Sequence, residues 1–222
     1  MTALLAILRR DFVLAFRSGG GWFYALFFFA VFTALSAIAF GPSLSALAIA
    51  APATLWLAIA LSVQFSAADL YENDIRDGSL RVIAAEQPSL LSYWGAKVCV
   101  LMITAVVPMI ATAPFFLTML GLSFGQGVIL AIILFMGAPA LVFIAVMTAA
   151  LASGLRAGGL LAMIIAVPFS VPVLVFAVRA SKSVLASSGL VTPESLILCA
   201  ISLFMAVLTP GFTIAALRVS LE

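Results

Sequence analysis

The sequence predicts an all-α integral membrane protein with six transmembrane helices. Of its 222 residues, 66% are hydrophobic and only 8% are charged, a composition far from that of a soluble domain. Long runs without Asp, Glu, Lys or Arg alternate with short polar passages. A helix needs about 20 apolar residues to cross the hydrocarbon core, so this length accommodates roughly six spans with short connections. A single transmembrane domain over residues 1–222 is therefore expected.

Six apolar runs are predicted to span the membrane. They cover about Trp22–Phe40, Leu47–Ala68, Val98–Leu122, Val128–Ser153, Leu160–Val178 and Leu196–Leu217. Gly41 and Pro42 predict a tight turn after the first run, and the link Ser123–Gly127 is predicted between the third and the fourth. Pro168 and Pro172 remove two backbone donors from the fifth run. They are candidate bend points that either kink this helix or make it discontinuous.

Residues 1–21 precede the first span and are predicted to form an interfacial helix. Arg9, Arg10 and Arg17 fall within about 100° on a helical wheel, which leaves most apolar side chains on other sides. Such a helix typically lies along the membrane surface with its cations in water.

The distribution of basic residues predicts the orientation. Of the ten Lys and Arg residues, only Arg179 and Lys182 fall on the second face of this topology. Loops rich in Lys and Arg stay on the cytoplasmic side. Both termini and the loop between the second and third spans should therefore be cytoplasmic.

Residues 69–97 form the longest polar passage and connect the second and third spans. A charged residue at the membrane centre costs about 2.5–3.5 kcal/mol or more, so this passage is expected in water. Leu70, Tyr71 and Ile75 recur at near-helical spacing, and Gly78 follows them. This pattern predicts a short amphipathic helix that Gly78 ends. The passage is either a solvated loop or a docking element for a partner.

Several classes of function lack the residues they need. The sequence has no histidine, and its two cysteines fall inside hydrophobic runs, which excludes a zinc site, an axial-histidine haem site and a His-based triad. No G-x-x-x-x-G-K-[ST] motif is present to cradle a nucleotide, and the predicted spans lack the ionisable residues of ion-driven carriers. A net charge of +2 gives no indication of nucleic-acid binding. These features are typical of a permease half that is powered by a separate ATPase, rather than of an enzyme or a metal- or cofactor-binding protein.

Five stretches resemble one known family in order along the chain. Residues 74–80, DIRDGSL, followed by Pro88 and Ala96-Lys97, are similar to the cytoplasmic loop of the CcmB family, the membrane subunit of the cytochrome c maturation haem exporter. The resemblance continues through residues 12–18, 155–159, 168–176 and 209–218. The sequence departs from the family in having Arg81 where Glu is frequent, and a single proline where the family has a cluster.

The resemblance implies an ABC-2-like (type V exporter) permease half in the bacterial inner membrane. Implied partners are an ABC ATPase subunit that hydrolyses ATP, a haem-handling membrane subunit, a small membrane subunit and, indirectly, a periplasmic haem chaperone. Residues 69–97 become a coupling loop, in which Asp74, Asp77, Gly78 and Leu80 are expected at the ATPase contact. Haem is implied as the transported substrate rather than as a bound cofactor.

Two questions stay open at the level of sequence. The chain either conducts haem or transmits ATP-driven motion that releases the loaded chaperone, and the absence of histidine favours the second role. The alternatives are a permease of the same architecture for a drug, a lipid or a polysaccharide precursor, and a scaffold that only assembles the haem-handling partners. A membrane enzyme is disfavoured by the charge-free spans.

Overall fold

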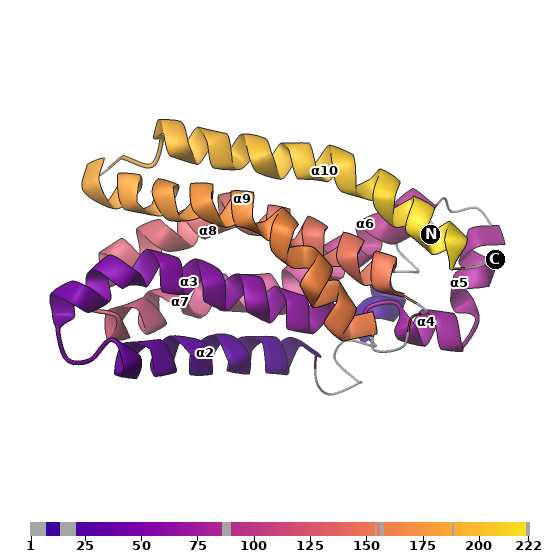
Figure 1. Cartoon of the computed structure of the whole chain (residues 1–222), viewed down its shortest axis with the longest axis horizontal. Coiled ribbons are helices and arrows are strands. Elements are labelled where there is room, and N and C mark those ends of the chain that lie inside the picture. Colours follow the sequence, from indigo (N-terminus) through magenta and orange to yellow (C-terminus); the bar gives the residue numbers. More distant parts are fainter. Residues whose placement is uncertain are drawn as a thin grey trace.

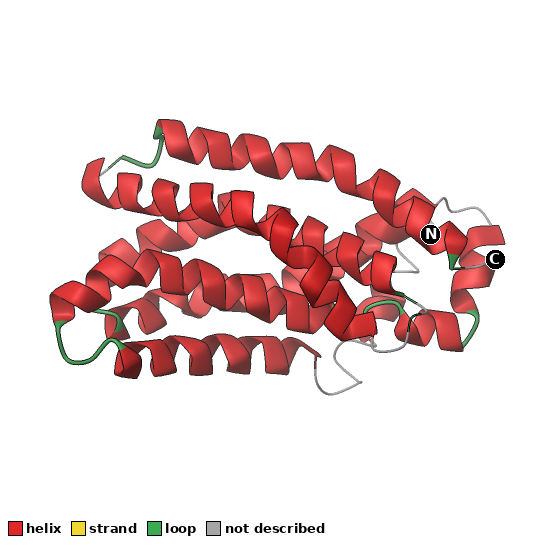
Figure 2. Ribbon diagram, in the orientation of Figure 1, coloured by secondary structure: helices red, strands yellow, loops and turns green. Residues whose placement is uncertain are grey.

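The computed structural model describes residues 8–13, 21–85, 90–153, 155, 158–187 and 189–220. Within these ranges every regular element is a helix (Figure 2). The helices are α2 (Gly21–Ala39), α3 (Leu44–Ala67), α4 (Glu72–Arg76), α5 (Ser79–Ala85), α6 (Leu90–Leu101), the π-helical segment η1 (Met102–Val106), α7 (Val107–Met119), α8 (Phe124–Ala152), α9 (Gly158–Ser187) and α10 (Pro193–Val219). Residues 8–13 form one more helical segment. The all-α class predicted from the sequence is confirmed.

The long helices pack side by side as an elongated bundle (Figure 1). α8 contacts α3, α7, α9 and α10, and it carries the longest series of fully buried side chains. The connections α2–α3, α7–α8 and α9–α10 lie at one end of the bundle, whereas α4, α5 and the last turn of α10 lie at the other (Figure 1). We call these the turn end and the loop end. The chain therefore runs back and forth along the bundle axis.

Charged residues of the described ranges gather at these two ends. Arg179, Lys182 and Glu194 belong to the turn end, because they lie in the last part of α9 and the first turn of α10. The other charged residues of these ranges lie in residues 8–13, in residues 69–97 or at Arg218, all of which belong to the loop end. Among the described residues, the middle of the bundle therefore carries no Asp, Glu, Lys or Arg, as lipid requires.

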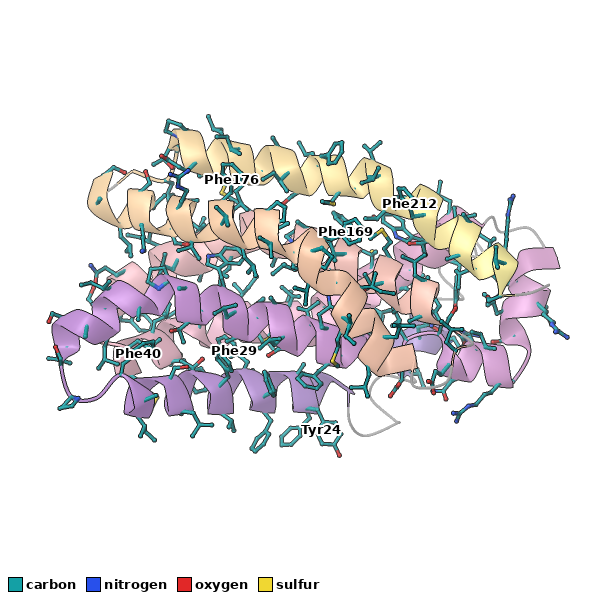
Figure 3. All side chains as sticks on the ribbon, viewed as in Figure 1. Tyr24, Phe29, Phe40, Phe169, Phe176 and Phe212 are labelled. Atoms are coloured by element: carbon teal, nitrogen blue, oxygen red, sulfur yellow. The ribbon has the colours of Figure 1, made fainter. Side chains whose placement is uncertain are left out.

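Five helices are long and apolar enough to cross a membrane, all within the described residues. They coincide with the second to sixth predicted spans, apart from differences of several residues at the ends. The first predicted span corresponds to α2, where Phe23–Ala39 is a shorter apolar helix. The side chain of Tyr24 projects outward from this helix and is 66% exposed, whereas Phe29 turns inward and is fully buried (Figure 3).

The third predicted span begins earlier than the sequence indicated. Helical structure starts at Leu90 rather than near Val98, because Leu90, Tyr93 and Ala96 recur on one face and are buried against the bundle. The helix then widens into η1, where the amide of Val107 donates to the carbonyl of Met102. A proline ring clashes with the carbonyl four residues earlier, so the wider π turn accommodates Pro108.

The predicted link at Ser123–Gly127 is also displaced. Ser123 caps α8, which starts at Phe124, and Ser123 and Gln126 form a reciprocal capping box. The capping box stabilises a helix start where the two glycines had indicated a loop. The tight turn predicted at Gly41 is confirmed, since its φ of +76° lies in the left-handed region that favours glycine.

α9 is one continuous helix from Gly158 to Ser187, with both Pro168 and Pro172 inside it. The alternative in which these prolines make the span discontinuous is therefore wrong. Figure 1 shows α9 changing direction along its length, and the two prolines stay the candidate causes of that bend.

Polar contacts between helices help to align the bundle. The Trp56 indole Nε1 on α3 donates to Ser181 Oγ on α9 at 2.8 Å, and both side chains are buried. Ser202 Oγ on α10 donates to the carbonyl of Met136 on α8 at 2.8 Å. Hydrogen bonds of this kind align membrane helices at about 1 kcal/mol each or less.

Candidate functional site

Four charged side chains meet at the loop end, and we call them the four-charge cluster: Arg10, Asp11, Asp74 and Lys97. They come from residues 8–13, from α4 and from α6. Lys97 Nζ lies 2.7 Å from Asp74 Oδ2 and 2.9 Å from Asp11 Oδ2. Arg10 Nη2 donates to Asp74 Oδ1 at 2.9 Å, and Arg10 Nε donates to Asp11 Oδ1 at 2.9 Å. Each carboxylate therefore meets both cations.

Two hydroxyl groups complete the surroundings of the Asp74 carboxylate. Tyr93 Oη on α6 donates to Asp74 Oδ2, and Ser79 Oγ on α5 donates to Oδ1 at 3.2 Å. The Lys97 ammonium also lies 5.1 Å from the centre of the Tyr93 ring, within range of a cation–π interaction. Asp74 thus links α4 to three other segments of the loop end.

The four-charge cluster is largely removed from water. The exposed fractions are 4% for the side chain of Asp11, 5% for Asp74 and 8% for Lys97, and only Arg10, at 33%, reaches the surface. Burying one unpaired ion costs several kcal/mol, whereas two cations and two anions at hydrogen-bonding distance offset most of that penalty. A shift of α4 relative to α6 would separate these charges, so the cluster fixes the position of α4.

The turn after α4 presents a different surface. Asp77 is exposed, and its Oδ1 accepts the backbone amide of Ser79 at 2.9 Å, a hydrogen bond that lowers the pKa of Asp77. Gly78 has a φ of +74°, which confirms the prediction that it ends the preceding short helix. Leu80 is fully buried against the bundle.

The structure divides the four predicted coupling residues into two groups. Asp74 and Leu80 face inward and hold the loop in place, whereas Asp77 is exposed and the half-buried Gly78 forms the turn beside it. The sequence-based interpretation expected all of residues 69–97 in water, and the burial of Tyr93 and Lys97 corrects it.

Sequence reasoning missed Arg10, Asp11, Tyr93 and Lys97 as members of a site. One signal was available: Lys97 is the only charged residue of α6, next to a long apolar run, and such a residue usually has a partner. Arg17, the third arginine on the basic face predicted for the N-terminal helix, lies outside the described residues.

No metal site accompanies the cluster in the described part of the chain. No group of three or more Cys, Asp or Glu side chains is arranged there to hold an ion. Cys99 and Cys199 are both free thiols.

Comparison with known proteins identifies the family. The model of the CcmB protein family matches residues 2–220. The chain belongs to the CcmB family. It is similar to a heme exporter protein B from Bradyrhizobium diazoefficiens, with 36% identity over 222 residues and all of both chains covered. Proteins of the same name from Haemophilus influenzae and Escherichia coli are 33% and 32% identical, over 98% and 97% of this chain and 98% of each relative.

The CcmB-family match covers the whole four-charge cluster. It includes residues 8–13, α4 with its following turn, and α6. The resemblance inferred from five short stretches of sequence is thereby confirmed over the full bundle.

Proposed function

We propose that this chain is the permease subunit of an ABC-type haem exporter complex needed for c-type cytochrome biogenesis. The observation that carries the proposal is the match of the CcmB family along nearly the entire chain, with relatives named heme exporter protein B. The multi-pass apolar bundle supports a membrane subunit. With α2 as the first span, the chain has six spans and forms an ABC-2-like, type V exporter half of the inner membrane, with both termini cytoplasmic.

ATP hydrolysis takes place in a separate ABC ATPase subunit, because this sequence has no phosphate-binding loop of the P-loop type. The loop end contacts that subunit through the turn formed by the exposed Asp77 and by Gly78. Asp74 and Leu80 act from inside by holding the turn against α6 and the bundle. The remaining partners are a haem-handling membrane subunit, a small membrane subunit and, indirectly, a periplasmic haem chaperone.

Transmission of motion is favoured over direct conduction of haem. The sequence has no histidine to ligate haem iron. Several buried hydroxyls inside the bundle, among them Thr33, Ser62, Thr209 and Thr213, donate to carbonyls of their own helices. Pro168 and Pro172 are proposed to permit the bend of α9 that this motion uses.

A strain that lacks this chain is expected to lose mature c-type cytochromes. The measurement follows covalent haem on both the periplasmic chaperone and the cytochromes. Haem on the chaperone with empty cytochromes supports release, whereas an empty chaperone supports conduction or assembly. Normal cytochrome maturation contradicts the proposal and favours the alternative function, a permease for another substrate. If complexes with an inactive ATPase still deliver haem, the result favours the other alternative, in which this chain is a scaffold that only assembles the haem-handling partners.

Replacement of Asp77 tests the exposed turn. Asp77→Lys should abolish co-purification of the ATPase subunit, since it reverses a surface charge at the proposed contact. Asp77→Asn keeps an oxygen acceptor for the Ser79 amide, so it separates loss of charge from loss of the local turn. Arg218→Gln, at the same end on α10, is the control. Unchanged recovery of the ATPase with Asp77→Lys refutes the contact.

A further inference from the structure

An apolar groove opens on the flank of the bundle between α3 and α9. It has a volume of about 380 Å³ and is lined by Ala53, Trp56, Leu57, Leu174, Val175 and Val178. The volume lies within the range of small-molecule sites. All six lining side chains are apolar, and Leu57 and Val175 are 45% and 49% exposed at its edge. The groove therefore suits a hydrocarbon chain.

Trp56 lies at the base of this groove, and its only polar group already has a hydrogen-bond partner. Its indole Nε1 donates to Ser181 Oγ at 2.8 Å, and Trp56 itself is fully buried. An occupant above Trp56 thus meets the aliphatic side chains of the groove, and Trp56 leaves no unpaired polar atom beneath them. This argues for an apolar segment rather than a polar ligand.

A cation lies on α9 beyond the groove, towards the turn end. Lys182 follows Val178 by four residues and Val175 by seven, which are the spacings of one helical face. At 1.5 Å per residue, Lys182 is displaced by about 6 Å and 10 Å along the axis from these two residues. Its side chain is exposed and forms no ion pair with any residue of the described ranges.

Lys182 also lies at the right depth for a lipid headgroup. Gly158 begins α9 at the loop end, and Lys182 follows it after about 36 Å of helix. The hydrocarbon core is about 30 Å thick. The path along α9 from Gly158 to Lys182 thus exceeds the thickness of the hydrocarbon core, which favours Lys182 at the headgroup end of the groove.

Arg179 lies about one helical turn from Lys182 on α9, but its surroundings differ from those of Lys182. On a helical wheel it lies about 90° from the mean direction of the three α9 residues that line the groove, against about 30° for Lys182. Arg179 also lies close enough to Glu194 on α10 to interact with its charge. Of these two cations, Lys182 is thus the one that lies on the helical face of the groove.

We infer that the α3–α9 groove and Lys182 form a binding site for an anionic phospholipid of the phosphatidylglycerol type. One acyl chain occupies the groove over Trp56, and the headgroup phosphate pairs with the Lys182 ammonium. A compact ammonium is a suitable partner for phosphate, and charge complementarity distinguishes this lipid from a zwitterionic one.

The site can be tested with the full chain in nanodiscs that contain phosphatidylcholine and a photoreactive phosphatidylglycerol. The reactive group is placed in the acyl chain, and labelled peptides are mapped by mass spectrometry. Labelling is expected on the segments that contain Leu57 and Val175. Lys182→Gln should reduce it about fivefold, the effect of one surface cation on an anionic lipid. Arg179→Gln, the matched control on the same helix, should change it less than twofold.

A second variant tests the groove itself. Leu57→Trp fills the edge of the groove at an exposed position and should remove acyl-chain labelling while Lys182 is intact. Thermal unfolding midpoints of all three variants should equal that of the parent chain. Equal labelling by photoreactive phosphatidylcholine, or labelling unaffected by Lys182→Gln, overturns the site and leaves only non-selective lipid contact.

Discussion

Replacement of Lys97 by Met is expected to destabilise the chain by about 3–5 kcal/mol, the cost of breaking a buried ion pair from one side. Lys97 Nζ is 2.7 Å from Asp74 and 2.9 Å from Asp11, and both carboxylates are at least 95% buried. Without Lys97 the two anions share Arg10 alone. The measurement is the thermal unfolding midpoint of the purified chain in detergent, together with its amount in membranes.

Two further variants separate charge balance from a general loss of packing. Lys97→Met combined with Asp11→Asn restores one cation against one anion and should recover part of the lost stability. Arg76→Gln is the control, because Arg76 pairs with Glu72 at an exposed i,i+4 position that contributes about 0.3–0.5 kcal/mol. If Lys97→Met is no more harmful than Arg76→Gln, the cluster does not hold the loop end together.

The same variants connect stability to the proposed coupling. If Asp74 positions the turn for the ATPase subunit, Lys97→Met should weaken ATPase co-purification even where the chain is still recovered from membranes. The double variant should recover ATPase binding in parallel with stability. Recovery of stability without ATPase binding would indicate a second role for Asp11, which lies next to Arg10 on the N-terminal segment.

The sequence predicted the helices of this fold well because lipid imposes a single strong requirement. Each span needs a long apolar run without ionisable groups, and such runs can be read directly from composition. Five of the six predicted spans coincide with helices long enough to cross a membrane. The turns at Gly41 and Gly78 were predictable for an equally local reason, since a left-handed residue is usually glycine.

The four-charge cluster was not predictable in this way. One of its pairs, Arg10 and Asp74, joins residues 64 positions apart, and a local sequence pattern does not indicate such a contact. The early start of α6 has a related origin: Leu90, Tyr93 and Ala96 recur at helical spacing, and Tyr93 and Lys97 also find partners on α4 and the N-terminal segment. Composition alone made this stretch appear as a polar loop. Local patterns thus identified the helices, whereas the partners of Tyr93 and Lys97 become visible only in the fold.

Gly127→Ala is expected to destabilise the bundle, since Gly127 on α8 lies against the backbone of α7. A Cβ atom there would lie 2.8 Å from Pro114 Cα and 3.1 Å from the Pro114 carbonyl oxygen. Neither atom can move without displacing α7, so overpacking should cost about 1–3 kcal/mol. Small residues at such contacts let membrane helices approach closely. The measurement is again the unfolding midpoint in detergent.

Gly125→Ala is the matched control, two residues earlier in the first turn of α8. A Cβ atom there would meet nothing within 4 Å, and Gly125 is exposed. Its replacement should leave stability unchanged or raise it by about 0.4–1 kcal/mol, because alanine restricts the unfolded chain. A comparable loss from both variants would mean that chain flexibility near the capped start of α8, rather than the α7–α8 contact, determines stability. A loss from Gly127→Ala alone would show that backbone contact sets the spacing of α7 and α8, since both variants add the same methyl group to the same helix.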